Sequence, residues 1–469
     1  MHDDRGTVED HDPYLKEIPG VIRSDEHRES LVAIFHSDVV SEHMEDGVVA
    51  DAVLPGRLGD ERLAQETRYL VKRRVARYFA IRLERCGARA VESAIAEKSP
   101  AGPNGDGPVR SPLVTPPPDA LMPAAVYLGN GDMAVRSVPV PVPGPGEALV
   151  EVSHCGICGT DLHLVLEQYA RPDTVLGHEW SGTLAALGDG VRDEGVDGWE
   201  LGARVVADAT PGCGECRACL RGRPAVCLRR EPTDFLAFTG AFTQYKVVAA
   251  SRLLRIPDSL SMRHAALTEP TAIAIHTVHL AGVTPDDRVL VTGAGPVGLL
   301  TTAVLHAQGV HDITVSEPAP RRRERALAVG AKAVCTPDEL LAASMGQPVE
   351  QPFTVAFECS GHASAAEQAL DQLDYAGTLV FVGTGNKMPK INHNRAIIFE
   401  LTIIGAYNYD AEGFGPALEL LASGALPLDE LVEADDVGLP GVLDAMHRLA
   451  AGDLAGKVMV TPTSTAQRI

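Results

Sequence analysis

The spacing of hydrophobic and polar positions changes along the chain. From about residue 262 to residue 406, short apolar runs such as VLVTG, DITVSE, FTVAFE and TLVFVG alternate with Ala-rich stretches of helical character. Buried strands that alternate with helices are typical of a parallel sheet with crossover helices. We therefore predict an α/β fold with a doubly wound parallel sheet over residues 263–406.

A second pattern of hydrophobic and polar residues begins near Met122. Short β-rich runs, among them Ala148–Val152 and Ala203–Ala207, are divided by Pro and Gly as far as residue 262. This pattern predicts a smaller, β-rich domain over residues 121–262. The last segment, residues 407–469, combines a helix at Pro416–Leu421 with short extended pieces that end in KVMVTP.

The first 98 residues form a separate region with one strong helical pattern. Apolar side chains recur at helical spacing within Asp60–Lys98. The same stretch carries a run of basic residues: Lys72, Arg73, Arg74, Arg77, Arg82, Arg85 and Arg89. Its basic side is either an ordinary solvated helix face or a surface for an acidic partner. Residues 99–120 are rich in Pro and Gly and are predicted to be a linker. We expect a partly helical extension that is dispensable for chemistry.

Composition and charge exclude several classes of protein. The chain has 469 residues and carries 41 basic and 63 acidic side chains, a formal net charge of −22. An acidic protein repels phosphate backbones and anionic lipids, so neither nucleic acid nor a membrane is an expected partner. The acidic start MHDDRGTVED does not resemble a secretory signal. The nine cysteines therefore indicate metal binding in a reducing cytoplasm rather than a disulfide framework.

Four cysteines have the spacing of a structural zinc site. They lie within fifteen residues, and glycines beside them allow the backbone to wrap around an ion. Four thiolates form a closed tetrahedral shell that leaves no position for a substrate. The alternatives are free or disulfide-paired thiols, or a zinc ribbon for DNA, whose spacing and charge fit poorly. The four are Cys213, Cys216, Cys219 and Cys227.

A second, mixed set of ligands precedes this lobe. Cys158, His178 and Glu179 offer one thiolate, one imidazole and one carboxylate, a combination that suits a catalytic zinc with an open position. Asp161 is a candidate acceptor for the ring N–H of a ligand histidine. Thr160 and His163 could pass a proton from the metal to solvent.

A glycine-rich turn follows the first predicted strand of the parallel sheet. Val289–Gly298 runs from an apolar strand into a helix and contains a G-x-G-x-x-G pattern, and an acidic residue, Glu317, ends the next strand. Such a turn brings a pyrophosphate to a helix N-terminus, and the acid accepts the ribose 2′-OH of NAD. Arg321, Arg322 and Arg323 follow and would favour NADP, so both cofactors stay open with NAD preferred. The candidate cofactor residues are Gly293, Gly295, Pro296, Val297, Gly298, Glu317 and Arg322.

Together these motifs resemble the zinc-dependent medium-chain alcohol/polyol dehydrogenase family over Met122–Thr461. The resemblance implies a GroES-like catalytic domain, interrupted by a Rossmann domain and completed by residues 407–469. It places Cys158, His178 and Glu179 at the catalytic zinc and the other four cysteines at the structural zinc. In the LTEP segment, Glu269 stands where alcohol dehydrogenases proper have a cysteine, as in the sorbitol, butanediol and threonine dehydrogenase-like branch.

The resemblance also implies the reaction. A zinc-dependent oxidoreductase with two zinc ions would transfer hydride from a secondary alcohol or polyol to NAD or NADP, with Thr160 and His163 as the proton path. The family leads us to expect a homo-oligomer, a dimer or tetramer. The alternatives are a zinc-free reductase, disfavoured by the two ligand sets, and a non-catalytic nucleotide sensor with structural zinc.

Overall fold

The computed structural model describes residues 117, 120–191, 198–209, 212–229, 240–341, 344 and 346–463. The predicted helix at Asp60–Lys98, the rest of the extension and nearly all of the linker lie outside these residues. Within the described part of the chain, no helix is both long enough and apolar enough to cross a bilayer.

Six strands form the predicted parallel sheet. Every pair of neighbours in it is parallel, and the strand order is β11-β10-β9-β12-β13-β14. This order reverses beside the first strand, as in doubly wound dinucleotide-binding sheets, and it confirms the predicted fold class. The strands are β9 (Arg288–Thr292), β10 (Asp312–Ser316), β11 (Ala333–Cys335), β12 (Phe353–Glu358), β13 (Leu373–Phe381) and β14 (Thr402–Gly405).

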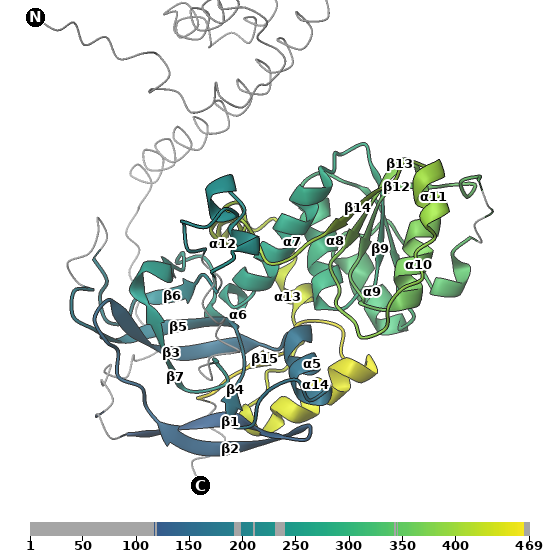
Figure 1. The fold of residues 1–469 in the computed structure, drawn as a ribbon. Helices are drawn as coiled ribbons and strands as arrows, with labels where there is room; N and C mark the ends of the chain where they lie inside the picture. The colour runs from purple at the N-terminus through teal and green to yellow at the C-terminus, as the bar shows by residue number, and fades with distance from the viewer. Residues whose placement is uncertain are drawn as a thin grey trace, which may run out of the picture. The chain divides into compact units, whose positions relative to one another are not determined.

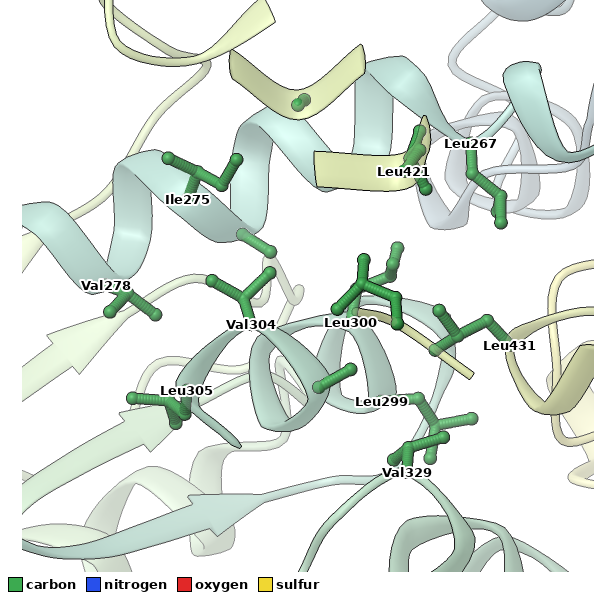
Figure 2. Packing of buried hydrophobic residues seen from close by; sticks show 14 of the residues in the cluster. Leu267, Ile275, Val278, Leu299, Leu300, Val304, Leu305, Val329, Leu421 and Leu431 are labelled. Carbon is green, nitrogen blue, oxygen red and sulfur yellow. The ribbon is translucent and has the colours of Figure 1, made fainter. Parts of the chain in front are cut away.

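Helices cover both faces of this sheet. Successive side chains of a strand point to opposite faces, so Val289 and Val291 of β9 join one core whereas Leu290 joins the other. Figure 2 shows the first core, in which Leu300 and Val304 of α8 lie beneath Ile275 of α7. The helices of this part are α7 (Thr268–Ala281), α8 (Pro296–Ala307), α9 (Pro320–Ala328), the short helix η7 (Pro337–Glu339), α10 (Ala363–Asp371) and α11 (His393–Ile398).

The β-rich part contains two further sheets. The larger has the order β15-β3-β5-β6-β8 with β7 beside β3, and the smaller has the order β2-β1-β4 (Figure 1). Their strands are β1 (Leu121–Gly129), β2 (Asp132–Pro139), β3 (Glu147–Gly156), β4 (Thr174–Val175), β5 (Glu179–Leu187), β6 (Arg204–Ala207), β7 (Tyr245–Ala249), β8 (Leu253–Arg255) and β15 (Met459–Val460). The accompanying helices are α5 (Gly159–Leu166), η4 (Cys219–Arg221), η5 (Pro224–Val226), η6 (Ala250–Arg252) and α6 (Met262–Ala265).

The segment after residue 406 is shared between the two cores. The apolar side of α12 (Phe414–Ala422) covers α7 and belongs to the core of the parallel sheet. After α13 (Leu428–Leu431) and η8 (Leu439–Gly441), α14 (Val442–Ala451) packs against α5, and β15 pairs with β3 (Figure 1). Residues 407–469 thus contribute α12 to the core of the parallel sheet, and α14 and β15 to the β-rich part. The domain bounds given in the sequence analysis stay a prediction.

Candidate active site

The candidate site is a cleft of about 500 Å³ between the β-rich part and the parallel sheet. Its walls come from α5 and the start of β5 on one side, and from α8 and the loops after β12, β13 and β14 on the other. Six residues expected at the catalytic zinc and on the proton path line it, together with Val297 of the glycine turn. These six are Cys158, Thr160, His163, His178, Glu179 and Glu269.

Three of these side chains converge as metal ligands would. The thiol of Cys158, a ring nitrogen of His178 and a carboxylate oxygen of Glu179 all lie within 4.8 Å of one another. Cys158 is the N-cap of α5. His178 follows Gly177, which has a positive φ, and Glu179 is the first residue of β5. One soft and two harder donors around a small volume fit a zinc ion whose remaining position is open to the cleft.

Asp161 lies next to Cys158 and His178. It is fully buried, its Oδ2 accepts a hydrogen bond from the Cys158 backbone N–H at 2.9 Å, and its Oδ1 lies 3.7 Å from Nδ1 of His178. Burial raises the pKa of Asp161. Although burial opposes it, the charges of Cys158 and Asp161 raise the pKa of His178 well above its usual value. The position fits a residue that orients the His178 ring.

Lys457 is a part of the site that the sequence analysis missed. Its ammonium lies 2.6 Å from Glu179, and both side chains are about 1% exposed. It also donates to the backbone carbonyl of Ile157 at 3.3 Å. A buried carboxylate needs such a partner, because an unpaired charge in the interior is strongly destabilising. The only sequence signal was a lysine inside the otherwise apolar run KVMVTP.

Glu269 reaches the same cleft from the opposite side. It lies in the first turn of α7 and is 8% exposed, and burial raises its pKa to about 7. It stands outside the close group formed by Cys158, His178 and Glu179. Glu179 thus has Lys457 as its ion-pair partner. Glu269, which also lines the cleft, has no Lys or Arg at ion-pair distance among the described residues.

The expected proton path ends in a hydrogen-bond chain that crosses the cleft. Nδ1 of His163 lies 2.9 Å from Oε1 of Glu167, one helical turn later on α5. Oε2 of Glu167 accepts from Nδ2 of Asn386, and Oδ1 of Asn386 accepts from the hydroxyl of Tyr169 at 3.1 Å. Although burial works against it, the bonds from His163 and Asn386 lower the pKa of Glu167. The sequence offered no signal for this contact, which joins residues 219 positions apart.

The four-cysteine lobe has the geometry of a closed metal site. Its sulfur atoms all lie within 4.8 Å of one another, with separations of 3.6 Å between Cys216 and Cys219 and 3.9 Å between Cys216 and Cys227. Zinc–sulfur bonds of about 2.3 Å in a tetrahedron place sulfurs about 3.8 Å apart. Backbone N–H groups, first those of Cys219 and Leu228, lower the pKa of Cys216 to about 6, which favours the thiolate. The lobe fits zinc.

The glycine turn is built to bring a ligand close to the backbone. Gly293 has a φ of +90°, and a Cβ there would meet Ser360 at 2.7 Å. A Cβ at Gly298 would meet the carbonyl oxygen of Gly293, so this glycine allows close packing of helix against strand. Nothing lies within 4 Å of a Cβ position at Gly295, which caps α8 just before Pro296. The space beside Gly295 and the N-terminus of α8 fits a pyrophosphate.

Two candidate cofactor residues make specific contacts within the protein. The carboxylate of Glu317 accepts hydrogen bonds from the N–H groups of Ala294 and Ala319 at 2.8 and 2.9 Å, so it braces the glycine turn. The guanidinium of Arg322 donates to the carbonyls of Leu449 and Leu454 and thus joins α9 to the end of α14. A role for Glu317 and Arg322 in cofactor binding stays a prediction.

Comparison with known proteins identifies both parts of the structure. Residues 144–258 match the family described as alcohol dehydrogenase GroES-like domain, and residues 296–423 match the family described as zinc-binding dehydrogenase. L-threonine 3-dehydrogenase of Pyrococcus horikoshii is 36% identical over 335 residues, which cover 69% of this chain and 93% of that protein. Sorbitol dehydrogenase of Bacillus subtilis is 33% identical over 356 residues, 73% of this chain and 97% of that protein.

A solved structure agrees with these matches. A protein from Sinorhizobium meliloti 1021, described as a zinc-binding dehydrogenase and bound to NADP, superposes with a TM-score of 0.65 and 30% sequence identity. The alignment covers 73% of this chain and all of that one. The β-rich part is thus a GroES-like domain, and the parallel sheet is a Rossmann domain, as the sequence analysis expected.

Proposed function

The chain belongs to the zinc-binding dehydrogenase family, and from this premise we propose that it oxidises a secondary alcohol or a polyol with NAD(P) as hydride acceptor. The observation that carries the proposal is a single cleft. It is lined both by the Cys158, His178 and Glu179 ligand group and by Val297 of the nucleotide-binding turn. A metal-activated hydroxyl and a hydride acceptor can therefore meet there.

We assign two zinc ions to each chain. The four-cysteine lobe holds a structural ion, and Cys158, His178 and Glu179 hold a catalytic one, with Glu269 facing it directly or through water. When bound, the catalytic zinc supplies Lewis acidity that makes a substrate hydroxyl easier to deprotonate. Lys457 pairs with Glu179 and fixes its position, and Asp161 orients His178.

Thr160 and His163 provide the route by which the hydroxyl proton leaves. Both line the cleft on α5, and His163 is one-third exposed, so its imidazole can exchange a proton with solvent. Glu167 accepts the hydrogen bond of the Nδ1 atom, which leaves Nε2 free to act as the base. His163 is therefore the base and Glu167 its positioning residue.

NAD is the preferred cofactor in this proposal. A carboxylate at the end of β10 repels a 2′-phosphate and can accept a ribose hydroxyl, and Glu317 occupies that position. Arg322, the nearest candidate for a 2′-phosphate, is engaged by two backbone carbonyls of the C-terminal segment. The solved structure from Sinorhizobium meliloti contains NADP. The proposed preference of this chain for NAD therefore depends on its own Glu317 and Arg322, and kinetics with both cofactors test it.

We further propose a homo-oligomer in a reducing compartment, the cytoplasm. Strand β14 ends the parallel sheet in the described part of the chain, and Ile397, Ile398 and Ile403 beside it are 69%, 51% and 43% exposed. An edge strand with apolar neighbours favours pairing with a second copy. All eight cysteines of the described residues are free thiols, as metal binding in a reducing environment requires.

The function is tested by metal analysis together with cofactor reduction. Freshly purified protein should contain about two zinc ions per chain and should reduce NAD, more slowly NADP, with secondary alcohols or polyols. Removal of the accessible zinc by a chelator should abolish turnover before the four-cysteine site is emptied. A zinc-loaded protein that oxidises no member of a broad alcohol and polyol panel would refute the proposal.

A further inference from the structure

The loop after β14 brings an unusual side chain to the cleft. Ala406 continues the sheet by donating to the carbonyl of Phe381 at 2.8 Å, and the next residues, Tyr407 and Asn408, line the cleft together with Glu269. Neither the glycine turn nor the metal ligands include this loop. It therefore lines the cleft apart from the expected phosphate-binding and metal-binding residues.

The amide of Asn408 is a hydrogen-bond donor without a protein acceptor. Its Nδ2 atom is buried and makes no hydrogen bond to any of the described residues. Leaving a buried amide unpaired is destabilising, and native proteins rarely keep such a group without a reason. Asn408 also has a φ of +53°, in the left-handed region that non-glycine residues seldom adopt. Asn is among the non-glycine residues most often found in this region, so the unpaired amide is the feature that points to a ligand.

Flanking contacts hold Asn408 in this arrangement. The hydroxyl of Tyr409 donates to Oδ1 of Asp208 at 2.9 Å and accepts from the N–H of Ala209 at 3.1 Å. The carboxylate of Asp410 accepts from Nε of Arg223 at 2.7 Å and from the N–H of Ala225 at 2.8 Å. Both donors to Asp410 belong to the four-cysteine lobe. These contacts fix the backbone on the C-terminal side of Asn408, so the amide cannot move to an acceptor within the protein.

We propose that Asn408 donates a hydrogen bond to a second oxygen of the substrate and thereby selects polyols and diols over simple secondary alcohols. The proposal rests on the dehydrogenase function. A hydroxyl oxygen fits this donor better than a carboxylate, because the lining includes the carboxylate of Glu167. Among its described lining residues, none is Lys or Arg. A simple alcohol would leave the buried amide unpaired, which is the strongest basis for discrimination by a binding site.

The test compares substrates with the same carbon skeleton. Wild type should show a higher kcat/KM for 2,3-butanediol than for 2-butanol, and Asn408→Gly, which suits the left-handed backbone, should lower the ratio at least tenfold. Asn130→Gly makes the same exchange at φ +54° in the exposed turn between β1 and β2, and should leave the ratio unchanged.

Binding provides a second readout that does not depend on turnover. Calorimetry with the zinc-loaded complex with NADH should show at least tenfold weaker binding of the diol to Asn408→Gly than to wild type. Equal diol binding, or an unchanged kcat/KM ratio, would overturn the role of Asn408. If Asn408→Gly weakens the use of L-threonine more than that of the diol, the amide binds a substrate carboxylate rather than a second hydroxyl. Absence of any alcohol oxidation by wild type, with the binding difference intact, would refute the dehydrogenase proposal alone.

Discussion

Glu167 links the base of the proton path to the opposite wall of the cleft. Its two oxygens accept from His163 and from Asn386, and Glu167→Gln would leave only one oxygen for these two donors. We expect kcat to fall about tenfold at pH 6.5, part of the 10²–10⁴-fold that a positioned base contributes. The loss should be smaller near pH 9, where hydroxide can replace the base. The pH dependence of kcat measures both effects.

The control for this prediction is a double-mutant cycle. If Glu167 acts through His163, Glu167→Gln should have little further effect on kcat in a His163→Ala background. Equal losses in the two backgrounds would show that Glu167 contributes by another route, such as closing the cleft through Asn386.

Glu317 combines cofactor recognition with bracing of the glycine turn. Glu317→Ala removes the repulsion of a 2′-phosphate and also releases the N–H of Ala294. KM for NAD should rise tenfold or more, whereas KM for NADP should rise less, so the preference for NAD shrinks. Steady-state kinetics with both cofactors measure the change. A wild type that already works better with NADP would contradict our interpretation of Glu317.

At the scale of elements, the four-cysteine lobe supports the loop after β14 through Asp410. Asp410→Asn weakens the ion pair with Arg223 and should cost about 1–3 kcal/mol of unfolding free energy, because the carboxylate is buried. Thermal denaturation of the zinc-loaded protein measures the loss. Asp173→Asn is the matched control, since its pair with Arg136 is more than half exposed on both sides and should contribute little.

This coupling also has a kinetic consequence. If Asp410 holds the loop, its substitution should raise KM for a diol more than it changes kcat, because the binding wall moves while the metal ligands stay in place. A fall in kcat alone, with KM unchanged, would contradict the idea that the lobe positions the loop.

Local patterns in the sequence predicted the elements that depend on short segments. The strand and glycine turn at Val289–Gly298, the four-cysteine lobe and the Cys158 to His178 ligands all follow from spacing within a few tens of residues. Contacts between distant segments left no such pattern. Glu179 and Lys457 are 278 positions apart, and the orphan amide of Asn408 becomes visible only when the loop is seen against the cleft. The packing of α12 against α7 also left no signal in the sequence, because an apolar helix face does not show which core it covers.

At the scale of the whole molecule, the edge of the Rossmann sheet is the expected site of self-association. Ile403→Lys places a charge on β14, and Ile397→Lys does so on the neighbouring helix α11. Each should shift the protein toward smaller species, because a buried lysine without a partner opposes assembly. Sedimentation velocity at several concentrations measures the shift. An unchanged distribution in the double variant would exclude this edge as the interface.

The N-terminal region is expected to be separable from the chemistry. Every candidate ligand, proton-path residue and glycine of the nucleotide turn lies after residue 120. Pro117 is the first residue that the structure describes, and its carbonyl accepts from the N–H of Ala120. A chain that starts at Pro117 keeps this contact and the bond from Val140 to Ala120. It should retain two zinc ions and a kcat within a few-fold of the full chain.

Zinc content, circular dichroism and steady-state kinetics on the two chains decide this prediction together. The full chain purified in parallel is the control for folding and metal loading. If the shortened protein is folded and carries both zinc ions but has lost nearly all activity, residues before 117 must reach the cleft or order its walls. If it loses zinc as well, the extension stabilises the fold rather than the reaction. Only retention of both properties supports an extension that acts outside catalysis.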